Sequence, residues 1–70
     1  MLFENIIKRT EYIGKRIKMI KMNDPYPIEP NTMGTIRDVD GIGQYVVSWD
    51  NGRTLSVIPE DDEYEIQEGE

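Results

Sequence analysis

Asn51-Gly52 stands between two short apolar runs in the stretch YVVSWDNGRTLSVIP, residues 45–59. Asn-Gly is the strongest short-range signal for a β-hairpin, because a tight hairpin turn needs positive φ at its central residues. Both runs are too short for helices and are rich in β-branched and aromatic side chains, which favour strands. The stretch therefore predicts an antiparallel pair of strands over residues 45–49 and 53–58.

The only tryptophan of the chain, Trp49, directly precedes this turn. A strict two-residue turn places Trp49 opposite Thr54 and sends Leu55 to the other face of the hairpin. One bulged residue places Trp49 opposite Leu55 and gathers the apolar side chains on one face. Because a buried face fixes strand register, we prefer the second arrangement. It predicts that Trp49 is a core residue whose indole N–H finds a polar partner. The alternative is an exposed Trp49 that contacts a partner.

The rest of the chain predicts further short elements around the hairpin. They are a helix over 2–12 that Gly14 ends, strands over 15–22, 33–39 and 63–67, an ordered extended loop over 23–32 with three prolines, and a helical turn over 59–62. Five short strands in this order are typical of an SH3-like barrel. We expect an all-β fold, a five-stranded SH3-like barrel over 14–67, with a short N-terminal helix or arm over 1–13 and a frayed acidic tail over 68–70.

The residue types exclude several kinds of chemistry. The 70 residues include no cysteine and no histidine, so disulfides, Cys/His zinc sites and thiol nucleophiles are excluded. We expect no enzyme activity, because no nucleophile–base pair stands out and the chain is too small to enclose a dry pocket. No apolar run approaches the roughly 20 residues of a membrane span, and the start does not resemble a signal peptide. A cytoplasmic protein without membrane association is expected.

The net charge of −6 is unevenly distributed. Residues 60–70 contain seven acids and no base. This acidic stretch either keeps a small protein soluble, or it mimics the phosphate backbone of a nucleic acid and occupies the nucleic-acid channel of a partner protein. The candidate contact residues are Asp61, Asp62, Glu63 and Glu65. The carboxylate spacing matches no calcium-binding loop, so neither a metal nor another cofactor is predicted.

The first part of the chain is basic by contrast. Its candidate nucleic-acid contacts are Lys15, Arg16, Lys18 and Lys21. A sequence pI near 4.5 argues against nucleic-acid binding, because neutralisation of phosphates dominates that affinity. The first and last strands of an SH3-like barrel are neighbours, so we predict instead that Lys18 pairs with Glu65. Asp50 and Arg53, which flank the hairpin turn, are expected to form a local ion pair.

Tyr26 lies among the prolines of the 23–32 loop. Together with Tyr45 and Trp49 it could line an aromatic groove of the kind that binds proline-rich helices. The alternative is that Tyr26 packs against its own loop. Tyr26 and Trp49 therefore join the acidic residues as candidate partner contacts.

Several motifs resemble a known family when they are taken together. They are Gly14-Lys15-Arg16-Ile17, the proline loop, Met33-Gly34-Thr35-Ile36, Val47-x-Trp49-Asp50-x-Gly52-Arg53-Thr54-Leu55 and Pro59…Asp62-Glu63-Tyr64. They resemble a family of small domains of unknown function from Gram-positive bacteria, their phages and mobile elements, over about residues 13–66. More loosely, they are similar to SH3-like barrels of the KOW type. The resemblance implies the barrel fold and no particular activity.

We expect a small acidic binding module. Its expected partner is a bacterial protein, for example a nucleic-acid enzyme or defence nuclease, which a module derived from a phage or mobile element modulates or inhibits. The alternative is a housekeeping adaptor or a KOW-like nucleic-acid-binding barrel. We expect a monomer or a homodimer, the latter through an unpaired edge at Ile20–Met22.

Overall fold

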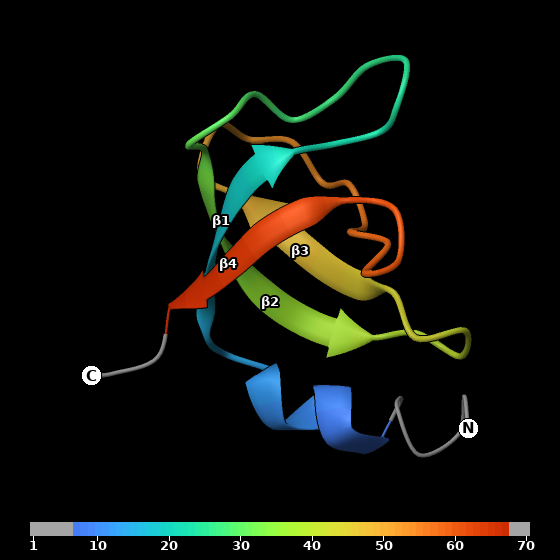
Figure 1. Ribbon diagram of the computed structural model, residues 1–70. Coiled ribbons are helices and arrows are strands. Elements are labelled where there is room, and N and C mark those ends of the chain that lie inside the picture. Colours follow the sequence, from blue (N-terminus) through green and yellow to red (C-terminus); the bar gives the residue numbers. More distant parts are fainter. Residues whose placement is uncertain (1–6, 68–70) are drawn as a thin grey trace.

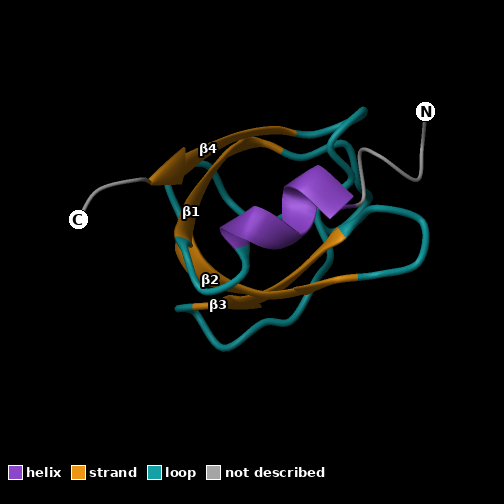
Figure 2. Ribbon diagram, turned by 90° about the horizontal axis from the view of Figure 1, so that it is seen from below, coloured by secondary structure: helices purple, strands orange, loops and turns teal. Residues whose placement is uncertain are grey.

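The computed structural model describes residues 7–67 of the chain. Its strands form one antiparallel sheet in the order β3-β2-β1-β4 (Figure 1). They are β1 (Arg16–Lys21), β2 (Met33–Val39), β3 (Tyr45–Trp49) and β4 (Glu63–Gln67). The mainly β class and the positions of these four strands confirm the predictions. Seen from below, the strands curve around a central space (Figure 2).

The predicted strand over 53–58 is wrong. This segment forms no continuous ladder with β3 but two isolated bridges, Ser48 to Thr54 and Tyr45 to Val57, so the sheet is open. A side chain takes a backbone group that a continuous ladder would need, because the Leu55 carbonyl accepts a hydrogen bond from the Trp49 indole at 2.9 Å.

The hairpin turn contains three residues, 50–52. The Trp49 N–H donates to the Arg53 carbonyl at 2.9 Å, and Gly52 adopts φ +92°, which glycine accepts without steric cost. Trp49 is therefore opposite Arg53, and both predicted partners, Thr54 and Leu55, are wrong. The preferred arrangement was nevertheless right in one respect, because the odd-numbered residues of both arms share a face.

That shared face belongs to the hydrophobic core, which is built from alternate residues of β1, β2 and β3 and from the adjoining loops. The buried residues are Ile17, Met19, Met22, Ile28, Ile36, Tyr45, Val47, Trp49 and Val57. Trp49 is 3% exposed, which confirms its interpretation as a core residue. Gly34 in β2 lets β3 approach closely, since a Cβ there would lie 2.7 Å from Val47 Cγ1 and 2.9 Å from the Ser48 carbonyl oxygen.

The N-terminal segment covers one end of the curved sheet (Figures 1 and 2). Residues 7–9 are helical and continue into a 3₁₀ turn, Thr10–Tyr12. Gly14 follows with φ +93°, as predicted for the residue that ends the helix. Arg9 ties the segment down by donating to the Gly43 carbonyl at 2.7 Å and to Glu60 at 3.0 Å. The other parts of the predicted helix and the 68–70 tail lie outside the described residues.

β1 is an inner strand between β2 and β4. The predicted unpaired edge at Ile20–Met22 is therefore wrong, since Lys21 is opposite Glu63 in β4.

Candidate protein-binding surface

The proline loop, residues 23–32, leaves β1 and returns to β2 along one end of the molecule (Figure 1). Ile28 anchors it from within the core at 1% exposure. Arg53 holds it from the hairpin, because its guanidinium donates to the Pro27 carbonyl at 2.9 Å and to the Tyr26 carbonyl at 2.7 Å. The Asp24 carboxylate accepts from the Tyr26 N–H at 2.9 Å. The backbone around Tyr26 is thus fixed by three hydrogen bonds.

The Tyr26 side chain is 78% exposed at this fixed position. The predicted aromatic groove is wrong, because Tyr45 and Trp49 are 2% and 3% exposed and belong to the core. Trp49 therefore offers no contact surface to a partner. Tyr26 does not pack down on its own loop either.

The four predicted acidic contacts do not form one surface. Asp62 is 7% exposed, and its carboxylate accepts from the Asn23 N–H and from the Ile58 N–H, both at 2.9 Å. It therefore joins the turn before β4 to the start of the proline loop. The prediction that Asp62 is an exposed partner contact is wrong. Glu65 is opposite Lys18 in the sheet and 3.7 Å from its ammonium, which confirms that predicted pair.

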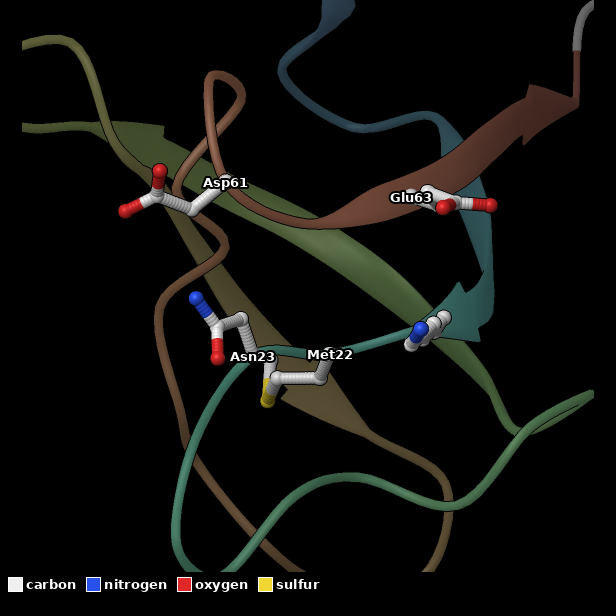
Figure 3. Close-up of a pocket in the computed structure, with 5 residues that line it drawn as sticks. Met22, Asn23, Asp61 and Glu63 are labelled. Carbon is white, nitrogen blue, oxygen red and sulfur yellow. The ribbon is translucent and has the colours of Figure 1, made fainter.

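The two remaining acids, Asp61 and Glu63, line a hollow of about 270 Å³ with Lys21, Met22 and Asn23. Asp61 and Asn23 lie on one side of the opening and Glu63 lies on the other (Figure 3). This volume is slightly below the about 300–1,000 Å³ that is usual for pockets of drug-sized ligands. Because Met22 and Asn23 lead into the proline loop, the hollow and Tyr26 share one end of the molecule. We call residues 23–30, Asp61 and Glu63 the loop end.

Of the predicted basic contacts, Arg16 and Lys18 are paired with carboxylates. Arg16 forms a two-pronged ion pair with Asp50, and this hydrogen bonding lowers the pKa of the Asp50 carboxyl and raises that of Arg16. The predicted pair between Asp50 and Arg53 is therefore wrong. Lys15 is half-buried, and Lys21 is exposed beside the hollow.

Sequence reasoning missed Arg9 and Arg53, which hold the N-terminal segment and the proline loop. It also missed the tyrosine cluster beneath Arg9. The Tyr45 ring packs edge-on against Tyr64, with ring centroids 5.7 Å apart, and burial raises the pKa of both phenols. These groups are structural, because Tyr45 is buried in the core.

The model of one protein family, described as Domain of unknown function (DUF4314), matches residues 5–67. The chain belongs to this family. The match begins well before residue 13, so the DUF4314 domain includes most of the N-terminal segment that the resemblance left out. No match was found among curated proteins or among solved structures.

Two further properties of residues 7–67 concern membranes and metals. No helix in this range is long and apolar enough to cross a membrane. Within the same range, no three or more His, Cys, Asp or Glu side chains are arranged so that they could hold a metal ion.

Proposed function

We propose that this domain is a non-enzymatic binding module that contacts a partner protein through its loop end. The observation that carries the proposal is Tyr26, whose ring is 78% exposed although its backbone is held by hydrogen bonds on both sides. Tyrosine is enriched among the few residues that dominate binding energy at interfaces. A side chain on a fixed backbone also loses less conformational entropy on binding.

Charge gives the loop end its preference among partners. Asp24, Glu29, Asp61 and Glu63 are all exposed there, and they outnumber two nearby bases, Lys21 at the hollow and Arg53 on the loop carbonyls. A partner with a basic surface is therefore favoured over nucleic acid, whose phosphates would be repelled. The resemblance to domains of Gram-positive bacteria, phages and mobile elements supports a bacterial protein as the partner, which binding would modulate or inhibit.

We infer an SH3-like barrel as the fold that presents this surface. Three features support the inference: β1 neighbours β4, a long loop follows β1, and a turn at 58–62 precedes β4. The bridges from 53–58 to β3 lie where such a barrel has its fourth strand.

The test is an affinity pull-down of the tagged full chain from a bacterial lysate, with and without nuclease, read by mass spectrometry. We expect a protein partner that survives nuclease and is lost with Tyr26→Ala. Ile42→Ala is the matched control, because Ile42 is 63% exposed in the β2–β3 turn, away from the loop end. The buried Trp49 provides a fluorescence check that both variants are folded.

Two results would overturn the proposal. If both variants capture the same partners as the parent chain, Tyr26 is not the contact. If all partners disappear with nuclease, the basic residues of β1 are the working surface and the protein is a nucleic-acid-binding module.

A further inference from the structure

We infer that the loop end fits a groove on the partner that is lined by aromatic rings and supplies N–H or O–H donors. The inference deepens the proposed function and rests on it. It follows from the backbone of the proline loop, which offers several carbonyl acceptors to the outside but few free N–H donors, and from the rings that the loop exposes.

Most backbone donors of the loop are either absent or already used. Pro25, Pro27 and Pro30 have no N–H. The N–H of Ile28 donates to Met22 Sδ, and that of Tyr26 to Asp24. The N–H groups at the two ends are bonded as well: Asn23 to Asp62, Asn31 to the Met19 carbonyl and Thr32 to the Glu29 carbonyl. Within residues 23–32, only Asp24 and Glu29 have a backbone N–H without a partner among the described residues.

The acceptors are in the opposite situation. No described residue donates to the carbonyls of the exposed Asp24, Pro25 or Pro30. The carboxylate of Glu29 is exposed without a hydrogen bond from the described part of the chain. A partner that covers this surface must therefore donate hydrogen bonds, since a buried acceptor without a partner costs about 1–3 kcal/mol.

The apolar part of the surface is made of rings. Tyr26 lies between Pro25 and Pro27, and all three are exposed. Grooves that recognise proline-rich segments combine aromatic walls with donors to the peptide carbonyls. Arg53 already holds two carbonyls of the segment, so the loop is ordered before it meets a partner.

The experiment uses ¹⁵N-labelled full chain and two probes, indole and 1-methylindole, in NMR titrations. The probes share one aromatic ring system, but only indole has an N–H donor. We expect both to shift the amide signals of Asp24, Tyr26, Ile28 and Glu29. Indole should bind about threefold more tightly, the effect of one net hydrogen bond. Tyr26→Ala should remove the shifts, and Ile42→Ala should leave them.

Either of two outcomes overturns the inference. The first is equal binding of the two probes at the loop, which would mean that the acceptors play no part. The second is an absence of shifts at the loop, including the case in which they concentrate around the exposed Ile7, Ile13 and Ile42. The titration needs no cellular partner, so its result is independent of the pull-down. If Tyr26→Ala still captures partners in the pull-down while indole binds the loop in the titration, the proposed function is overturned but the inference about the chemistry of the loop is not.

Discussion

Asp62 offers the sharpest test of how the loop end is held together. Asp62→Ala deletes the acceptor of two part-buried backbone N–H groups, those of Asn23 and Ile58. Each lost bond to a carboxylate costs roughly 1–2 kcal/mol when water replaces it only in part. The sum is about 2–4 kcal/mol. A 70-residue domain has about 4–10 kcal/mol of stability in total, so the variant should lose a large share of it.

Urea unfolding followed by Trp49 fluorescence measures this loss directly, because Trp49 is the only tryptophan and is buried. Asp62→Asn keeps one acceptor oxygen and should lose about half as much as Asp62→Ala. Asp61→Ala is the matched control, since Asp61 is exposed, and should change stability by less than about 0.5 kcal/mol. The reasoning is refuted if Asp62→Ala and Asp61→Ala cost the same.

Three further predictions concern the sheet and its core. Gly34→Ala places a Cβ 2.8 Å from Trp49 Cε3 and should lower stability by about 1–3 kcal/mol, measured by the same urea unfolding; an unchanged midpoint would contradict the close approach. A double-mutant cycle on Lys18 and Glu65, with each charge reversed singly and together, should give a coupling under about 1 kcal/mol that 1 M salt reduces; no coupling would mean no pair. Burial raises the pKa of Tyr45 in the folded protein, whereas tyrosines of the unfolded chain ionise near pH 10. Above that pH, ionisation therefore stabilises the unfolded chain relative to the folded one, and the free energy of unfolding falls. Tyr45→Phe should lessen this alkaline loss of stability in unfolding curves between about pH 9 and 11.

Local patterns predicted the four strands well, because their apolar alternation reflects the two faces of the sheet. Lys18 and Glu65 could also be paired from sequence, since the expected topology set β1 beside β4. The hairpin register could not be predicted in the same way. Asn51-Gly52 suits a two-residue turn, but Gly52 also suits the last position of a three-residue loop. The three-residue loop buries the same apolar residues as the predicted bulged hairpin, so burial does not distinguish the two registers.

The candidate surface was harder to predict than the fold. Asp62 reads as one more acid in an acidic run, and nothing local indicates that its carboxylate bonds two distant N–H groups. Arg53 presents the same difficulty, because its partners are carbonyls 26 and 27 positions away. Exposure of Tyr26 followed from neither composition nor spacing, since an aromatic residue among prolines is compatible with a buried position as well.

The three-residue turn has a consequence for how such a protein can vary. Arg53 lies immediately after this turn, so its direction depends on the number of residues in 50–52. One inserted or deleted residue would move the Arg53 guanidinium to the opposite side of the hairpin and release both loop carbonyls. We therefore expect that natural variants with a longer or shorter turn at 50–52 also differ in the composition of the proline loop, although β2 and β3 separate the two segments in sequence.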